Sequence, residues 1–330
     1  MSKEQERVSE EDFISRKLLV FLRQEWKSPH LEYQTPLRPI TGGFETSIFQ
    51  AQLRGAPKAI PAGLVLRLFA GRVTGQAMRE SIVQNVISAT NYPAPRVFLT
   101  CQDKSVLGGE FNIMEKMPGK PMIESPSETI PEILGMSHAA LHRIDPAPLE
   151  RALEEEGIAQ RRLSLEGVFD WIRRRISSQG YDWLKPGLTW LEENRPETGL
   201  RAICHGDFHP LNILMREGKV TGVLDWSGFR ITDPVLDVGA TKIVLSILAP
   251  VLVPGTMTTG FVEHYLFAYK KESPTFSPMR LRYFEALRCI QGLLEGADGQ
   301  QAWRHPEVLT RILSMISSHT GLEIRRPQYH

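Results

Sequence analysis

The chain has 330 residues, 42% of them hydrophobic, which is ordinary for a soluble globular protein with two domains or one large bilobal one. Its 39 basic and 38 acidic residues leave a net charge of +1, which does not favour DNA, RNA or an anionic membrane as a partner. We therefore expect a small-molecule partner, and no nucleic acid, membrane or protein partner is evident. The cysteines are odd in number and far apart, which argues against a disulfide framework and a structural zinc site. Together with a charged amino terminus unlike a secretory signal, they predict a reducing, cytoplasmic setting.

The first part of the chain is predicted to form a helix and then a small antiparallel sheet. The helix is expected from near Ser9, where Ser9 and Asp12 have capping-box spacing. From Tyr33, short β-like segments alternate with glycine and proline as far as GLVLRLFAG. A second helix is expected in TGQAMRESIVQNVISAT, followed by strands in RVFLTC and GEFNIMEKM.

The turn MPGKPM marks a change of composition, because the chain beyond it is predicted to be mainly helical. We therefore expect one lobe over residues 1–114 and a second over residues 115–330, with a hinge at 115–118. Helices are expected in ETIPEILGMSHAALHRID and VFDWIRRRI, and a hairpin in ILMREGKVTGVLDW. The apolar run IVLSILAPVLVP is interrupted by Pro250 and is shorter than the roughly 20 residues of a membrane-spanning helix, so we expect it in the core.

The segment HGDFHPLNIL, residues 205–214, concentrates groups that can do chemistry. His205 and His209 have the spacing of two zinc ligands on one helix face. However, Gly206 and Pro210 oppose a helix, glutamate does not follow His205, and a third ligand is not obvious. These features disfavour a catalytic zinc site.

A second interpretation fits better, because Asp207 and Asn212 have the spacing of the kinase catalytic loop HRDLxxxN, with Gly206 in place of arginine. A further aspartate should follow a short hairpin, and Asp225 does so in VLDWSG, where protein kinases have DFG. Magnesium prefers hard oxygen ligands, which Asn212 and Asp225 can supply. Asp207 then has the position of the base that orients the attacking hydroxyl.

The first lobe contains candidates for the rest of a phosphate site, in the expected order. Gly42 and Gly43 lie in TGGFETS between two predicted strands, where the backbone could approach phosphates closely. Arg67 in LVLRL lies where kinases carry a phosphate-contacting lysine, and Glu80 on the next helix has the place of its ion-pair partner. Each alone would be a hairpin turn or a surface charge in most proteins. Their joint order favours a kinase-like site.

With these motifs in place, the chain resembles the aminoglycoside phosphotransferase family, which includes choline kinase-like and macrolide kinase-like enzymes. The most specific part is CHGDFHPLNILMREGKVTGVLDWSGFRITDPVLDVG, which is similar to the family's HGDxHxxN loop, its IDW aspartate and its DPxxD segment. The resemblance implies an α+β, bilobal protein-kinase-like fold with a small antiparallel-sheet N-terminal lobe and a larger, mostly helical C-terminal lobe. It also implies ATP bound between the lobes with Mg2+, and phosphate transfer to a hydroxyl of a small molecule.

The resemblance further implies a role for each matching position. Asp207 would be the catalytic base and Asn212 and Asp225 the magnesium ligands. The cofactor-binding positions would be Gly42, Gly43, Arg67, Glu80 and the hinge residues Glu115, Lys116 and Met117, with His205 and Asp237 supporting the catalytic loop. Arg67 departs from the family's usual lysine, and its forked guanidinium differs in geometry.

The acceptor stays open among aminoglycosides, macrolides, amino alcohols, sugars and hydroxyacyl thioesters. The run RRR at 173–175 fits either a solvated helix face or a site for an anionic substrate. Two rivals to a small-molecule kinase are considered. A nucleotide-binding pseudokinase or scaffold is motivated by Arg67, and a protein kinase is disfavoured because the interval from Asp225 to DPVLD is short for an activation segment.

Overall fold

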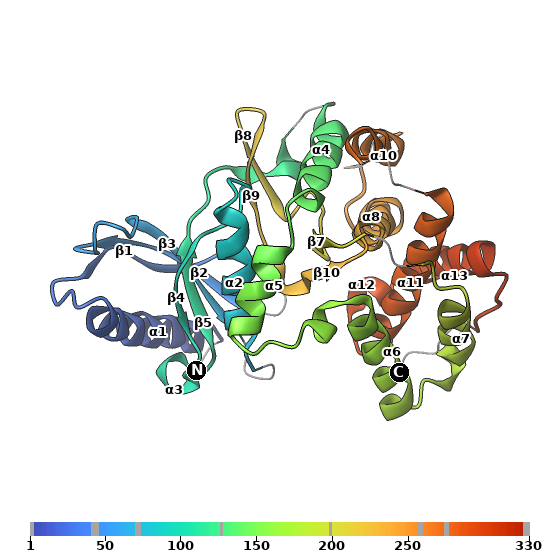
Figure 1. Ribbon diagram of the computed structural model, residues 1–330. Helices are drawn as coiled ribbons and strands as arrows, with labels where there is room; N and C mark the ends of the chain where they lie inside the picture. Colours follow the sequence, from blue (N-terminus) through green and yellow to red (C-terminus); the bar gives the residue numbers. More distant parts are fainter. Residues whose placement is uncertain are drawn as a thin grey trace. The chain divides into compact units, whose positions relative to one another are not determined.

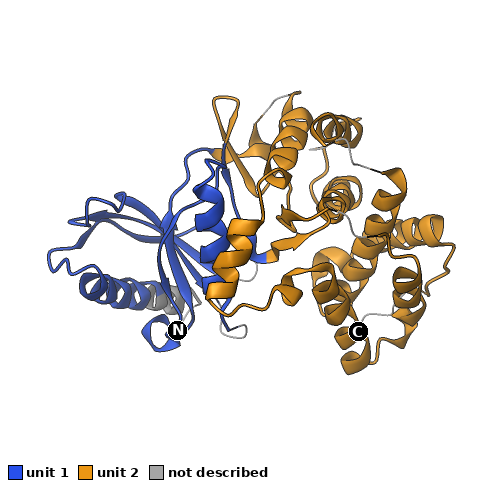
Figure 2. Cartoon of the chain, viewed as in Figure 1, with its two compact units in different colours: residues 1–119, 221–227 blue, residues 120–220, 228–330 orange. Residues whose placement is uncertain are grey.

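The chain is described from a computed structural model that covers residues 3–40, 46–69, 74–125, 128–197, 200–255, 260–273 and 277–325 (Figure 1). It consists of two compact units (Figure 2). Unit 1 comprises Met1–Gly119 and Thr221–Ser227, and unit 2 comprises Lys120–Val220 and Gly228–His330. The segment with Asp225 therefore belongs to unit 1, although it lies far along the chain.

Unit 1 is built on a five-stranded sheet with the order β1-β2-β3-β5-β4, in which each neighbouring pair is antiparallel. The strands are β1 (Glu32–Pro39), β2 (Thr46–Arg54), β3 (Gly63–Phe69), β4 (Val97–Cys101) and β5 (Phe111–Glu115). The helices of this unit are α1 (Lys3–Glu25), α2 (Gln76–Ser88) and α3 (Lys104–Leu107). The first helix begins at Lys3, earlier than the predicted start near Ser9, because KEQER consists of residues with high helix propensity.

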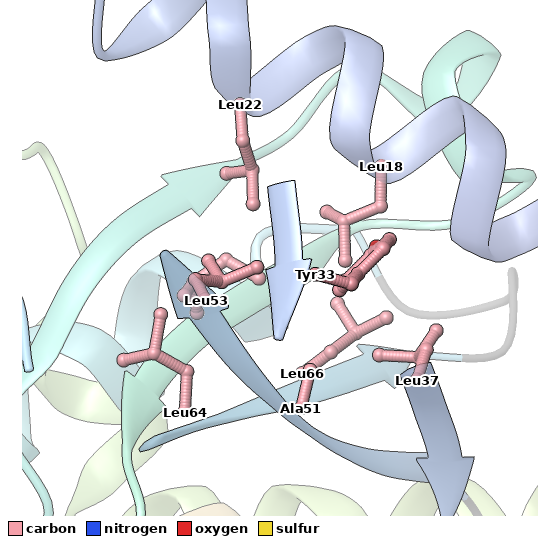
Figure 3. Close-up of a pocket in the computed structure, with 9 residues that line it drawn as sticks. Leu18, Leu22, Tyr33, Leu37, Ala51, Leu53, Leu64 and Leu66 are labelled. Atoms are coloured by element: carbon pink, nitrogen blue, oxygen red, sulfur yellow. The ribbon is translucent and has the colours of Figure 1, made fainter. Parts of the chain in front are cut away.

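The core of unit 1 lies between α1 and the sheet. Figure 3 shows Leu18 and Leu22 of α1 facing Leu53, Leu64 and Leu66 of β2 and β3. These five leucines are buried, as expected where a helix covers one face of a twisted sheet. This packing fixes the position of the sheet, and with it the side chains on the opposite face, because residues alternate between faces along a strand.

Unit 2 is mainly helical. Its helices are α4 (Ile130–His142), α5 (Ala147–Glu155), α6 (Leu165–Gln179), α7 (Lys185–Glu193), α8 (Pro234–Ile243), α9 (Ala249–Leu252), α10 (Phe261–Glu272), α11 (Pro278–Ala297), α12 (Gln301–Arg304) and α13 (Pro306–Thr320). Its short strands are β6 (Lys120–Pro121), β7 (Ala202–Cys204), β8 (Ile213–Arg216) and β10 (Arg230–Thr232), and β9 (Lys219–Val223) runs across the unit boundary. Helix α4 packs against α10, and α11 packs against α8 and α13. Strand β7, which leads into HGDFHPLNIL, pairs with β10.

The predicted apolar core segment is part of a longer helical stretch, Pro234–Leu252, and among the described residues this stretch alone is long and apolar enough to cross a membrane. Two thirds of its most apolar window, 67%, is buried inside the protein. Contrary to the expectation from Pro250, the helix continues through this residue. A π-helical turn, Val244–Leu248, directly precedes this region, and the Ala249 N–H bonds to the Val244 carbonyl. Proline has no N–H to donate, and helices commonly depart from regular α geometry beside it.

Candidate active site

The HGD segment leaves strand β7 as a series of turns and not as a helix, so His205 and His209 do not share a helix face. Gly206 has a φ of 86°, in the left-handed region that favours glycine. A Cβ atom at this position would lie 2.2 Å from the carbonyl oxygen of Gly228. This close approach explains why glycine stands where the protein-kinase loop has arginine.

Asp207 and Asn212, the predicted base and magnesium ligand, are joined by hydrogen bonds. The amide nitrogen of Asn212 donates to the Asp207 carbonyl oxygen and to Asp207 Oδ2, both at 3.0 Å. His209, to which the sequence assigned no role, has its Nε2 3.2 Å from the same Oδ2. The Asp207 side chain nevertheless keeps 46% of its surface exposed. It is thus both fixed and accessible to a ligand.

The electrostatic surroundings of Asp207 keep it ionised. Partial burial raises the pKa of the Asp207 carboxyl, but the hydrogen bond and charge of His209, with contributions from His205 and Arg288, lower the pKa to about 2. At neutral pH the side chain is therefore a carboxylate that accepts hydrogen bonds.

The Asp237 side chain holds the backbone of the same turn by two hydrogen bonds. Its Oδ1 accepts a hydrogen bond from Gly206 N at 2.8 Å and its Oδ2 one from His205 N at 2.5 Å. The His205 ring is buried, and its Nδ1 accepts from Asp207 N at 3.3 Å. The two predicted loop supports, His205 and Asp237, thus both contact the HGD turn. Two further histidines, His138 and His142, also contact Asp237 and were missed, although their spacing of one helical turn was a usable signal.

In unit 1, Arg67 joins two carboxylates. Its Nη2 lies 2.8 Å from Asp225 Oδ1 and its Nε 3.4 Å from Glu80 Oε2. Arg67 and Glu80 are only 7% and 1% exposed. Burial raises the pKa of Glu80 to about 7, although the charge of Arg67 opposes this shift. Arg67 on the strand, Glu80 on the helix and Asp225 after the hairpin, which were predicted in this order along the chain, are thus in direct contact.

Asp225 is one of the few non-glycine residues with a positive φ, 62°. Aspartate tolerates this conformation better than most residues because its short side chain can accept a local hydrogen bond. Here Oδ1 accepts from Ser227 N at 3.4 Å, and the buried Trp226 ring donates to the Val223 carbonyl at 2.9 Å. These local bonds aim the Asp225 carboxylate at Arg67.

Glu110, directly before β5, and Asn112 within β5 were not predicted to matter, but both contact the start of α2. Glu110, 2% exposed, accepts hydrogen bonds from the backbone of Gly75 at 2.7 Å and of Ala77 at 3.3 Å. Asn112, which pairs with Arg67 in the sheet, donates to the Ala77 carbonyl at 3.0 Å. A buried carboxylate at a helix N-terminus is stabilised by the helix dipole. A charged residue at the start of an apolar strand was the available signal.

The remaining predicted positions lie apart from these clusters. Gly42 and Gly43 fall outside the described residues. Glu115 ends strand β5, and its backbone N–H donates to Arg96 at 2.8 Å, while Lys116 and Met117 follow as irregular chain.

The arginine run at 173–175 is divided among different partners. Arg173 pairs with Glu192 at 2.6 Å, Arg174 donates to the Asp170 carbonyl at 3.1 Å, and Arg175 pairs with Asp298 at 3.2 Å. These separate pairings favour a solvated helix face over a shared anion site.

Comparison with known proteins gives the family. The model of the phosphotransferase enzyme family matches residues 36–281 of the chain. The chain belongs to this family. The predicted family resemblance is therefore confirmed.

Solved structures of this family have a similar fold. A macrolide 2'-phosphotransferase from Brachybacterium faecium superposes with a TM-score of 0.58 and 18% identity, covering 95% of this chain and 99% of that one. A thermostable mutant of aminoglycoside phosphotransferase APH(4)-Ia, in complex with AMP-PNP and hygromycin B, has a TM-score of 0.61 and 16% identity, covering 93% and 99%. These likenesses confirm the predicted α+β protein-kinase-like fold.

Among curated proteins, human acyl-CoA dehydrogenase family member 11 is 30% identical over 178 residues. The match covers 49% of this chain and 22% of the human protein. The chain thus spans about a fifth of the length of the first curated relatives it matches.

Proposed function

We propose that this phosphotransferase moves the γ-phosphate of ATP, with magnesium, to a hydroxyl group of a small molecule. The observation that carries the proposal is the Asp207–Asn212 pair, an accessible, ionised carboxylate bonded to an amide at 3.0 Å. The similar structure with AMP-PNP and hygromycin B supports a nucleotide donor and a small hydroxylated acceptor.

Asp207 would accept a hydrogen bond from the acceptor hydroxyl and orient its oxygen toward the phosphorus. A carboxylate with a pKa of about 2 is a weak base, so it would take up the proton late in the reaction. Such late transfer suits phosphoryl transfer, whose transition state is loose and needs little prior deprotonation of the nucleophile.

The residues present fit a magnesium ion. Because Asn212 uses its amide nitrogen on Asp207, its carbonyl oxygen Oδ1 is the atom that would ligate the metal. Asp225 would supply a carboxylate oxygen, and both are the hard donors that magnesium prefers. Bound magnesium would neutralise charge on the phosphate oxygens. Arg67 would contact a phosphate while Glu80 holds its guanidinium, and the backbone of 115–117 would bind the adenine.

The test is magnesium-dependent ADP release by purified protein over aminoglycosides, macrolides, choline, ethanolamine, sugars and hydroxyacyl thioesters. We expect one class to stimulate release, and Asp207→Asn to lower the stimulated rate by about 10²- to 10⁴-fold. Asp182→Asn, at an exposed aspartate on a surface pair, is the matched control and should keep full activity. A fully active Asp207→Asn variant would contradict the proposal.

One observation favours a rival function, a nucleotide-binding pseudokinase or scaffold. Arg67 already occupies an oxygen of Asp225, the proposed metal ligand, at 2.8 Å. Thermal shifts do not separate the two functions, because a ligand at a hundredfold excess over Kd stabilises either by about 2.7 kcal/mol. Turnover separates them: ATP binding without ADP release over the whole panel would favour the rival.

A further inference from the structure

A buried cluster of hydrogen bonds surrounds the Asp237 carboxylate, within unit 2. His138 and His142, one turn apart on α4, place their Nε2 atoms 3.1 and 3.2 Å from Asp237 Oδ2. Their Nδ1 atoms lie 2.8 and 2.7 Å from the hydroxyls of Tyr265 and Tyr269 on α10. Each imidazole thus bridges a tyrosine and the same carboxylate.

These contacts fix which ring nitrogens carry hydrogen. A carboxylate only accepts, so each Nε2 carries the hydrogen that it donates to Asp237. In a neutral ring Nδ1 is then the acceptor, so His138 Nδ1 accepts a hydrogen bond from the Tyr265 hydroxyl. Burial and the neighbouring His142 lower the pKa of His138 to about 4, so the neutral ring is the stable form at neutral pH.

The same three side chains are close enough to hold a metal ion. Hydrogen bonding accounts better for their arrangement, because the four ring nitrogens each have a matched partner and Asp237 Oδ2 also accepts the His205 backbone N–H. A metal would have to displace two of these bonds. We therefore develop the hydrogen-bonded form and use the metal content as a test.

His138 touches the HGD turn in a second way. Its ring stacks on Phe208, with centroids 4.1 Å apart and an interplanar angle of 17°. Phe208 directly follows Asp207, and its carbonyl accepts a hydrogen bond from Thr241 at 2.9 Å. His138 therefore restrains the turn both through Asp237, which holds the backbone before Asp207, and through Phe208, which comes after it.

We infer that His138 is a positioning residue for phosphate transfer, which keeps Asp237 and Phe208 in the arrangement that places the Asp207 carboxylate. The effect on rate rests on the proposed function, whereas the effect on the HGD turn does not. Tyr265 takes part indirectly, because its hydroxyl selects the ring form that donates to Asp237.

Three variants separate the contributions. His138→Leu removes both ring nitrogens. His138→Gln keeps an amide N–H at the place of Nε2, and Tyr265→Phe removes only the hydroxyl that selects the ring form. The matched control is His319→Leu, since His319 makes a similar bond to the buried Glu285 at 2.6 Å, and Glu285 keeps Lys242 as a second partner.

Two readouts are compared, magnesium-dependent ADP release and backbone amide hydrogen exchange over residues 205–208. We expect His138→Leu to lower kcat about 100-fold, as displacement of a reacting group by about 1 Å can do, with little change in KM for ATP. Exchange at 205–208 should accelerate in this variant more than exchange in α13. His138→Gln should restore most of kcat and most of the protection from exchange. Tyr265→Phe should give values between those of the wild type and His138→Leu. His319→Leu should leave kcat and exchange at 205–208 as in the wild type.

The inference is overturned if His138→Leu matches His319→Leu in both readouts, or if purified wild-type protein contains near-stoichiometric zinc whose removal alters exchange at 205–208. If His138→Leu does not fold, the comparison of His138→Gln with Tyr265→Phe decides by the same criteria. Asp207→Asn should lower turnover by about 10²- to 10⁴-fold and leave exchange at 205–208 unchanged. A wild-type protein without turnover would therefore reject the proposed function while exchange still tests His138.

Discussion

Each unit contains buried carboxylate groups next to predicted site residues, but the groups that hold these carboxylates differ between the two units. In unit 2, Asp237 is fully buried and is held by hydrogen bonds from two backbone N–H groups and from two imidazole rings. In unit 1, Glu80 and Asp225 share one guanidinium, and the Asp225 side chain keeps 39% of its surface exposed. The first arrangement fixes a backbone turn permanently. In the proposed function, Arg67 and Asp225 of the second cluster would instead pair with a phosphate and a magnesium ion.

The largest effect is expected where the fixed cluster loses its acceptor. Asp237→Asn places an amide against donors, so the backbone N–H groups of His205 and Gly206 cannot both be satisfied. Removing one member of a buried charged network typically destabilises a protein by about 3–5 kcal/mol. Urea unfolding should show this loss, while Asp182→Asn, at a side chain 71% exposed, should cost less than about 1 kcal/mol. Equal stability of the two variants would contradict the assigned role of Asp237.

The second-largest effect is expected from acid, which should lower the free energy of unfolding through the histidine cluster of unit 2. Unfolded histidine binds a proton below its ordinary pKa of 6.5, whereas burial and His142 keep His138 neutral in the folded protein down to a pKa of about 4. Between these values the unfolded state binds more protons, so stability falls as pH falls, by up to about 3 kcal/mol for this residue. The pKa of Asp237 is well below 3.8, so protonation of this residue lowers the stability of the protein further only in stronger acid. Urea midpoints from pH 7 to 4 test this, and His138→Gln should flatten the slope in that window.

The unit 1 cluster should tolerate the loss of one carboxylate better than the loss of its cation. Arg67→Met leaves the buried Glu80 without its guanidinium and should cost about 2 kcal/mol, less than for a fully buried pair because Asp225 is partly exposed. Glu80→Gln should cost less than about 1 kcal/mol, since an amide can still accept from Gln76. Unfolding at matched pH measures both, and a larger loss for Glu80→Gln would reverse our ranking.

Glu80 also gives this comparison a pH dependence. Its pKa rises from 4.5 unfolded to about 7 folded, so the folded state binds more protons in this range and wild-type stability falls as pH rises through it. The difference between wild type and Glu80→Gln should therefore shrink from pH 5 to pH 8. An unchanged difference would mean that the folded pKa is not raised.

The smallest effect is expected outside both clusters. Arg173→Ala removes a partly exposed pair with Glu192 and should change stability by less than about 1 kcal/mol and leave acceptor-dependent ADP release unchanged. A selective loss of turnover with an anionic acceptor would instead support an anion site at 173–175.

The sequence predicted the parts of the site that depend on local backbone geometry. Asp207 and Asn212 are five residues apart, so one local turn brings them together. Arg67 and Asp225 are separated by 158 positions, so their order was predictable but their direct ion pair was not. His138 is 99 positions from Asp237. Its one-turn spacing from His142 places both rings on one face of α4, but only the packing of the helix shows that their partner is Asp237. A charge directly before an apolar strand was a signal at Glu110, but its partners are backbone N–H groups, which carry no sequence signature.

The helices and strands were likewise predictable where they depend on local sequence patterns, and not where tertiary packing decides. Periodicity and glycine or proline turns located the sheet of unit 1 and the hairpin before Asp225. Pro250 was misleading, because a π-helical turn lets a buried helix continue past a proline when tertiary packing favours it.

The composition of unit 1 from two separated segments has a consequence for synthesis of the chain. A ribosome makes the first 119 residues, including Arg67 and Glu80, long before it makes Thr221–Ser227. In a chain translated only as far as Gly119, Arg67 can pair with Glu80 but not with Asp225, which follows after a further hundred or so residues of unit 2. The order of translation thus makes completion of the charged cluster one of the later steps in co-translational folding.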